Sequence, residues 1–136
     1  MLSSTLLAQL PMRWDPALDA ALQALAQMQP MMSQHPLGFS QWLQALAYSL
    51  STPREIAIVG DPEAADTQAL LSVVRGGYRP FEVVALGAPE PDKATVPLLQ
   101  DRGLVDGRSA AYVCRHSACQ APVTTAQALE GLLGEN

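Results

Sequence analysis

The chain has 136 residues, of which 49% are hydrophobic and 15% are charged, and its formal net charge is -5. This length fits one domain with a real core and is short for two independent domains. Eight basic residues against 13 acidic ones exclude the basic field that nucleic-acid binding requires, and the apolar content excludes disorder. The charged fraction lies below the quarter or so that is typical of soluble domains, which suggests that something else covers part of the surface.

The start of the chain predicts neither a secretory signal nor a membrane partner. Residues 1–11 lack a basic leading region, and their apolar stretch breaks at Gln9 and Pro11. No apolar run reaches the roughly 20 residues that span a bilayer. With two cysteines in the chain, we therefore expect a cytoplasmic, reducing setting in which a structural disulfide does not form.

Residues 1–52 are expected to be helical. Asp15 and Pro16 form a helix start. One apolar stripe follows at spacings of three and four: Leu18, Ala21, Leu22, Leu25 and Met28. Pro30 is expected to kink or end this helix. A second stripe predicts a second helix and thus a helical hairpin: Phe39, Trp42, Leu43, Leu46, Ala47 and Leu50.

Residues 53–136 alternate strands with helices. The pattern predicts strands at 56–59, 81–86 and 110–114, and helices that open at Asp61 and span 125–133. Gly76 stops the first of these helices, and Thr124 with Gln127 forms a capping box for the second. The connection over 88–107 holds at most one turn of helix. The expected fold class is α/β, with the helical hairpin packed on a three-stranded, mostly parallel α/β layer.

The ends of the predicted strands indicate where a pocket would lie. Ligands bind beyond the carboxyl ends of strands in open α/β sheets. Those ends are Gly60 with Asp61, Gly87, and Cys114, so we expect these residues to border any pocket. A phosphate is not expected there, because Asp61 and Glu63 already place carboxylates at the helix N-terminus.

Two cysteines, Cys114 and Cys119, flank a four-residue segment that contains His116. The favoured interpretation is that both are small apolar side chains that pack a turn. A redox pair is an alternative, with Arg115 available to stabilise a thiolate. A metal site that adds His116 is another, although zinc normally takes four ligands and the chain has two cysteines and two histidines. No cofactor and no catalytic constellation are predicted.

One segment carries a family resemblance. Residues 106–114 and 119–124 contain the string A-Y-V-C-x4-C-Q-A-P-V, which is far more specific than the cysteine spacing alone. This string resembles the C-terminal end of the thioredoxin domain-containing protein family (YyaL type, related to spermatogenesis-associated protein 20). The strand and turn over 55–62 and the helix over 35–50 are similar to the preceding part of that family. The resemblance therefore covers most of the chain, from about Trp14 onward.

The resemblance implies a larger protein in which a thioredoxin-like domain precedes a six-hairpin (α/α) toroid of the glycosidase or sugar-epimerase type. Residues 1–52 would be the last helices of the toroid, and 53–136 an α/β appendage. We therefore expect a non-catalytic structural or interaction module, whose partner is the rest of the parent chain or a second copy that binds through the apolar helices. An accessory redox or metal-binding module that uses Cys114 and Cys119 is the alternative.

Overall fold

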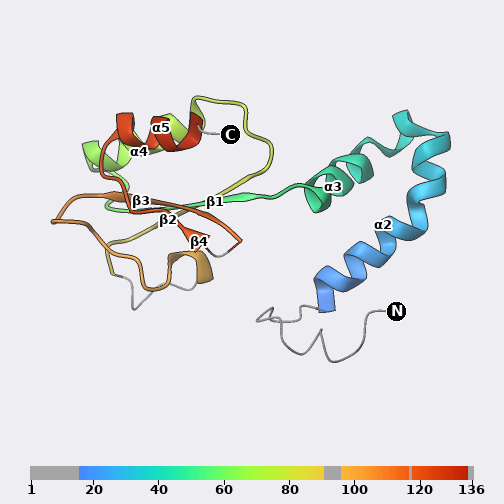
Figure 1. The fold of residues 1–136 in the computed structure, drawn as a ribbon, viewed down its shortest axis with the longest axis horizontal. Helices are drawn as coiled ribbons and strands as arrows, with labels where there is room; N and C mark the ends of the chain where they lie inside the picture. Colours follow the sequence, from blue (N-terminus) through green and yellow to red (C-terminus); the bar gives the residue numbers. More distant parts are fainter. Residues whose placement is uncertain (1–15, 91–95, 117, 135–136) are drawn as a thin grey trace. The chain divides into compact units, whose positions relative to one another are not determined.

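The computed structural model describes residues 16–90, 96–116 and 118–134 (Figure 1). Its contacts divide the chain into a helical unit, Met1–Leu50, and a sheet unit, Ser51–Asn136. The mixture of helices with a four-stranded sheet confirms the expected α/β class. Within the described ranges, no helix combines the length and the apolar character needed to cross a membrane.

The helical unit contains α2 (Pro16–Gln34), the 3-10 helix η1 (Pro36–Phe39) and α3 (Ser40–Leu50). Helix α2 continues through Pro30, so the alternative that it ends there is wrong. Pro30 lacks an N–H and so removes one backbone hydrogen bond, but the helix runs on to Gln34. The chain reverses its direction at η1 (Figure 1). The expected cap, Asp15, lies outside the described residues.

The sheet has the strand order β2-β1-β3-β4. Its central strand β1 (Arg54–Val59) pairs parallel with β2 (Glu82–Gly87) and antiparallel with β3 (Ala110–Arg115). The two-residue β4 (Ala118–Cys119) pairs antiparallel with β3. The expected layer of three mostly parallel strands is therefore corrected to four strands with one parallel pair and two antiparallel pairs.

The direction of β3 has a physical reason in the connection that precedes it. A parallel strand needs a crossover that returns the chain to the opposite edge of the sheet, usually through a helix. The described part of the connection between β2 and β3 contains only the short 3-10 helix η3 (Pro97–Leu99). The chain therefore re-enters the sheet at the end where β2 finishes. Strand β3 then runs antiparallel to β1, on the side of β1 that β2 does not occupy.

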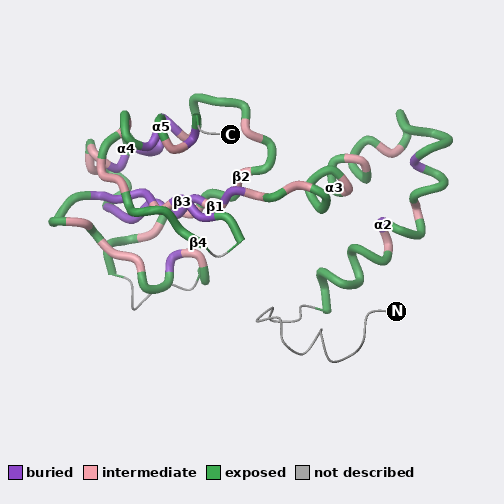
Figure 2. The backbone as a smooth tube through the Cα atoms, in the orientation of Figure 1, coloured by how far each residue is buried: buried purple, intermediate pink, exposed green. Residues whose placement is uncertain are grey.

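Helices α4 (Ala65–Arg75) and α5 (Ala126–Gly134) cover one face of the sheet (Figure 1). Aliphatic side chains from both layers make the core there: Ile56, Ile58, Ala111, Val113, Leu70, Leu71, Val73, Leu129 and Leu133. The opposite face packs Leu99 of η3 against Ala57 and Val59. Strands β1 and β3 are therefore largely buried (Figure 2). Each fully buried Ile or Leu contributes about 2 kcal/mol of transfer free energy.

Helix α4 begins later than expected. Residues 61–64 form a separate turn, in which the Ala64 N–H donates to the Asp61 carbonyl at 3.0 Å. The Asp61 carboxylate accepts the N–H of Glu63 at 2.9 Å, so it caps this turn and not the helix. Gly76 is the C-cap of α4, which confirms the predicted end.

Helix α5 is capped one residue later than the sequence pattern indicates. The Thr125 hydroxyl accepts the N–H of Ala128 at 3.3 Å. Thr125 is therefore the N-cap, and the capping box predicted from Thr124 and Gln127 is wrong by one position. The reason is that Val123 is held in a bridge to Ala111 of β3, so the helix cannot start until the chain has left the sheet.

Candidate functional site

The residues predicted to border one pocket lie at opposite edges of the sheet. Because β3 is antiparallel, Cys114 pairs with Glu55 near the start of β1, whereas Gly60 follows the end of β1. Gly60 and Gly87 do lie together, since the Gly60 N–H donates to the Gly87 carbonyl at 3.0 Å. Asp61 is exposed beside them. Cys114 therefore belongs to a different site, which corrects the expected common rim.

Side chains fill the space in front of Gly60. The hydroxyls of Thr67 and Ser109 lie 2.7 Å apart, and both residues are buried. The Asp66 carboxylate accepts the N–H of Ser109 and the N–H of Thr67, each at 2.9 Å. The bond from the Ser109 amide is the largest cause of the lowered pKa of Asp66. This polar cluster ties the loop before β3 to the start of α4, and the sequence analysis did not identify Asp66.

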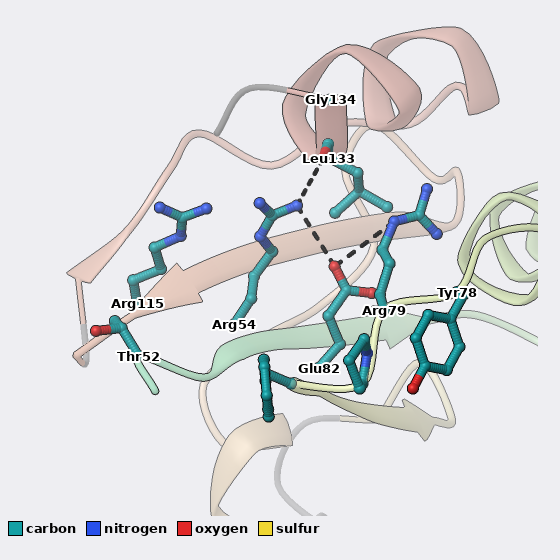
Figure 3. Close-up of a pocket in the computed structure, with 10 residues that line it drawn as sticks. Thr52, Arg54, Tyr78, Arg79, Glu82, Arg115, Leu133 and Gly134 are labelled. Atoms are coloured by element: carbon teal, nitrogen blue, oxygen red, sulfur yellow. Dashed lines mark hydrogen bonds and ion pairs between the residues drawn. The ribbon is translucent and has the colours of Figure 1, made fainter. Parts of the chain in front are cut away.

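A pocket of about 450 Å³ opens at the other edge of the sheet, where β1 and β2 begin and β3 ends (Figure 3). The strand register places Arg54 beside Glu82 on one side and Arg115 on the other. Arg54 is buried, and its Nη1 lies 3.4 Å from Oε1 of Glu82. Burial is the largest cause of both the raised pKa of Glu82 and the lowered pKa of Arg54.

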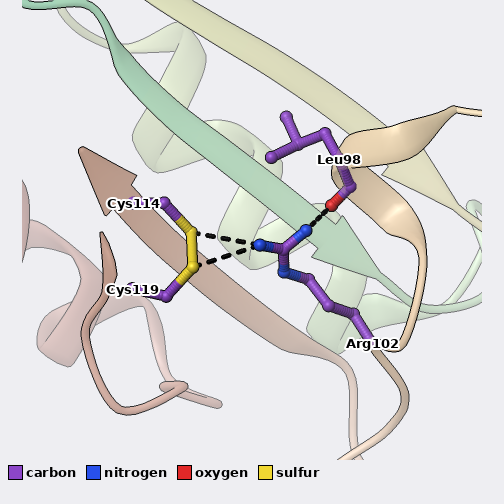
Figure 4. Close-up of a disulfide and its surroundings, with 4 residues drawn as sticks. All are labelled: Leu98, Arg102, Cys114 and Cys119. Carbon is purple, nitrogen blue, oxygen red and sulfur yellow. Dashed lines mark hydrogen bonds between the residues drawn. A yellow bond between two sulfur atoms is a disulfide. The ribbon is translucent and has the colours of Figure 1, made fainter. Parts of the chain in front are cut away.

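Cys114 and Cys119 form a disulfide across β3 and β4 (Figure 4). They are directly opposite each other, and the next backbone hydrogen bond runs from the Gln120 N–H to the Val113 carbonyl at 2.9 Å. The cysteines thus occupy a non-hydrogen-bonded pair, where facing side chains come closest. The expectation that no disulfide forms is corrected, because the tight hairpin itself brings the two sulfur atoms together.

His116 lies in the turn between the two cysteines. It is exposed, and its φ of 49° lies in the left-handed region that two-residue hairpin turns use. Across residues 16–90, 96–116 and 118–134, no three His, Cys, Asp or Glu side chains are grouped so that they could hold a metal ion. The metal interpretation of Cys114, His116 and Cys119 therefore gains no support.

A guanidinium group contacts the disulfide. Nη2 of Arg102 donates to Sγ of Cys119 at 3.1 Å and to Sγ of Cys114 at 3.3 Å, while its Nη1 donates to the Leu98 carbonyl (Figure 4). The same group lies 5.7 Å from the ring centre of Tyr112. Arg102 is thus fixed between an aromatic ring, a backbone carbonyl and the two sulfur atoms.

The arginine beside the sulfur atoms is Arg102, whereas the redox alternative drawn from the sequence had named Arg115. Arg115 is adjacent to Cys114 in the chain, but successive residues of a strand point to opposite faces, and Arg115 lines the pocket at the sheet edge. Arg102 lies 12 residues before Cys114 and has no spacing signal toward it. Only the fold of the connection before β3 brings the two together.

The fold and the site define an α/β protein with a cross-strand disulfide held beside a guanidinium. Spermatogenesis-associated protein 20 from Rattus norvegicus is 30% identical over 119 residues, which cover 85% of this chain and 15% of the relative. The proteins of the same name from Homo sapiens and Mus musculus are each 29% identical over the same length. These matches support the interpretation that the chain comes from a family related to spermatogenesis-associated protein 20.

The chain spans about 15% of the length of these curated relatives. No protein-family model matches the chain. No solved structure matches it either.

Proposed function

We propose that the chain is a non-catalytic structural and interaction module of a larger, cytoplasmic protein of the thioredoxin domain-containing type. In this proposal, α2 and α3 are the last helices of an α/α toroid and the sheet unit is its appendage. The partner is the rest of the parent chain, and a second copy binds the same surface when that chain is absent. The observation that carries the proposal is the apolar surface that the helical unit leaves uncovered.

This apolar surface belongs to both helices. Within the described part of the helical unit, only Leu25 and Met32 are buried. Large apolar side chains remain exposed on it, by between 37% and 96%: Leu18, Leu22, Met31, Leu37, Trp42, Tyr48 and Leu50. Exposed apolar side chains in such number on one unit are typical of a protein–protein contact. In the matched relatives, the corresponding region accompanies a much longer chain, which supports a partner of that origin.

The oligomeric state of the purified chain tests this proposal. We expect concentration-dependent self-association by light scattering, together with binding of an apolar fluorescent dye. Leu22→Glu places a charge on the apolar stripe and should reduce both signals. Gln27→Glu adds the same charge at an exposed polar position of α2 and should change neither. A monodisperse monomer that binds no dye would refute the proposal.

A second candidate function, an accessory redox module, rests on the contact between Arg102 and the disulfide. Cys119 is exposed and Cys114 is buried. One thiolate of an external dithiol would therefore attack Sγ of Cys119. The S–S bond would break, and its electron pair would pass to Sγ of Cys114, which then takes up a proton. The second thiol of the reductant would release Cys119 and leave the reductant as a disulfide. Arg102 would stabilise the departing thiolate of Cys114.

The rate of reduction by dithiothreitol tests this second candidate. Trapping with an alkylating reagent and mass measurement should show reduction of the Arg102→Gln variant about tenfold more slowly, as expected for the loss of about 1.4 kcal/mol from a charged hydrogen bond. Arg102→Lys should restore part of the rate. Arg108→Gln, an exposed arginine on the turn before β3, serves as the control. Equal rates for all four proteins would exclude a role for Arg102.

A further inference from the structure

Three of the eight basic residues of this acidic chain meet at the pocket at the sheet edge. Arg54 starts β1, Arg115 ends β3, and Arg79 precedes β2. They converge because β3 runs antiparallel, so that its last residue lies beside the first residue of β1. Figure 3 shows the three guanidinium groups in a row along the pocket.

The lining of this pocket is positively charged. Among the described residues that line it, Glu82 is the single carboxylate, with Oε1 at 3.4 Å from Arg54 and at 3.8 Å from Arg79. One negative charge against three guanidinium groups gives this described lining an excess of two positive charges. Arg115 also contributes to the lowered pKa of Arg54, after burial, which indicates that the two cations act on each other. A bound anion would relieve this repulsion.

Two of the three guanidinium groups are already held by the protein. Nη1 of Arg54 donates to the Leu133 carbonyl at 2.9 Å. Nη1 of Arg79 donates to the Val73 and Val74 carbonyls at the end of α4, at 3.2 and 3.4 Å. The Arg115 side chain makes no hydrogen bond or ion pair with any described residue. Its planar fork of donors is therefore available to a ligand, in a field that Arg54 and Arg79 strengthen.

The rest of the lining is suited to the apolar part of a small molecule. Tyr78 is 93% exposed and Phe81 is 38% exposed, and Pro80 lies between them in the chain. The volume of about 450 Å³ lies within the range of small-molecule sites, roughly 300–1,000 Å³, and exceeds what an inorganic ion needs. Ring faces and a guanidinium at one pocket match a ligand that has a flat apolar part and an anionic group.

We propose that this pocket binds a small organic anion, whose phosphate or carboxylate group pairs with Arg115 and whose apolar part extends along the pocket toward Phe81 and Tyr78, with Tyr78 at the opposite end of the row of arginines (Figure 3). Two parallel N–H···O bonds from one guanidinium recognise both kinds of oxyanion. The proposal is independent of the disulfide and of the apolar surface of the helical unit. It places a ligand site at the edge of the sheet opposite Gly60 and Gly87, where the sequence had predicted a pocket rim.

Calorimetric titration of the full chain with phenyl phosphate tests the proposal, with benzoate as the carboxylate probe and benzyl alcohol as the neutral analogue. We expect saturable binding of one or both anions and none of the alcohol. Arg115→Gln should weaken the binding at least tenfold, and Arg115→Lys by less, because the charge remains while the fork is lost. Inorganic phosphate should bind more weakly than phenyl phosphate, because the apolar side chains of the lining contact only the phenyl ring.

Arg108→Gln is the matched control, because it removes the same charge from an exposed turn outside the pocket. Its affinity should equal that of the unchanged chain. Thermal melts of both variants establish that each is folded, which we expect since the Arg115 side chain makes no hydrogen bond with any residue that the structure describes. Absence of binding by both anions at millimolar concentration would overturn the proposal. An equal loss in Arg115→Gln and Arg108→Gln would also overturn it, since it would indicate general charge attraction.

Discussion

At the scale of single residues, Gly60 is a position that leaves no room for a side chain. It follows β1 and lies against the paired hydroxyls of Thr67 and Ser109, and a Cβ on Gly60 would collide with both oxygens. Since both hydroxyls are buried, they have no solvent-filled space to move into. The glycine is thus required by close approach and not by an unusual φ.

Gly60→Ala should therefore destabilise the sheet unit by about 2 kcal/mol, in the range of other overpacked cores. The midpoint of urea unfolding measures this loss. Gly103→Ala is the matched control, because a Cβ there meets no atom within 4 Å. If the two variants unfold at the same midpoint, the packing described around Gly60 is incorrect.

The lowered pKa of Asp66 predicts a pH dependence of stability. A carboxyl group with a depressed folded-state pKa stabilises the fold fully above its unfolded pKa, about 3.9. This contribution is lost as the pH falls through the folded-state value. The difference in melting temperature between the unchanged chain and Asp66→Asn should thus be largest near pH 6 and shrink below about pH 3.9.

The control for this experiment is Asp101→Asn, an exposed carboxylate on the connection between η3 and β3. Its φ of 59° suits asparagine as well as aspartate, so the backbone tolerates the change. We expect its melting temperature to follow that of the unchanged chain at each pH. A constant difference between the unchanged chain and Asp66→Asn from pH 3 to 7 would show that the Asp66 hydrogen bonds do not depend on its charge.

At the scale of elements, the apolar patterns were sufficient to locate β1, β2, β3 and the last helix. The β-branched run at 56–59 and the glycine after α4 report local preferences that the fold retains. Strand β4 escaped prediction because two residues carry no periodic pattern. The antiparallel direction of β3 could have been predicted, because a connection with at most one helical turn already argues against a crossover.

The site was less predictable than the elements, for a reason that the arginines illustrate. Arg115 and Cys114 are neighbours in the chain, yet strand alternation sends their side chains to different sites. Arg102 reaches the sulfur atoms through the fold of the connection, and Arg54 meets Arg115 only because β3 is reversed. Sites that are assembled from distant segments depend on topology, which spacing along the chain does not encode.

Helix α5 offers a test of how its helical residues contribute to stability. Gly131 lies in its interior, and a Cβ at this position meets no atom within 4 Å. Gly131→Ala should therefore stabilise the protein by roughly 0.5–1 kcal/mol, because alanine loses less backbone freedom on folding than glycine. A higher urea midpoint with an unchanged slope is the expected result. A lower midpoint would contradict the open surroundings of Gly131, because it would mean that an added Cβ collides with a neighbour.

At the scale of the whole molecule, the net charge of -5 and the apolar surface of the helical unit act in opposite directions on association. Copies of the chain repel one another through their charge. Raising the salt concentration from 0.1 to 1 M shortens the screening length from about 10 to 3 Å and removes most of this repulsion. Apolar contacts are not weakened by this change.

Self-association should therefore increase with salt, and sedimentation equilibrium at 0.1 and 1 M sodium chloride measures the change in average mass. Leu22→Glu should remain smaller than the unchanged chain at both concentrations. A fall in mass at high salt would instead identify ion pairs as the source of the association, and would count against the apolar surface as the docking face.

The hydrogen bond from Arg54 to the Leu133 carbonyl joins the first strand of the sheet unit to its last helix, 79 residues later. The polypeptide thus enters and leaves this unit at the same edge, as the lining of the pocket by both Thr52 and Gly134 also shows. The start and the end of the sheet unit therefore lie close together. A circular permutant, with these two ends linked and new termini opened in the exposed turn at Asp106 and Gly107, should retain the sheet.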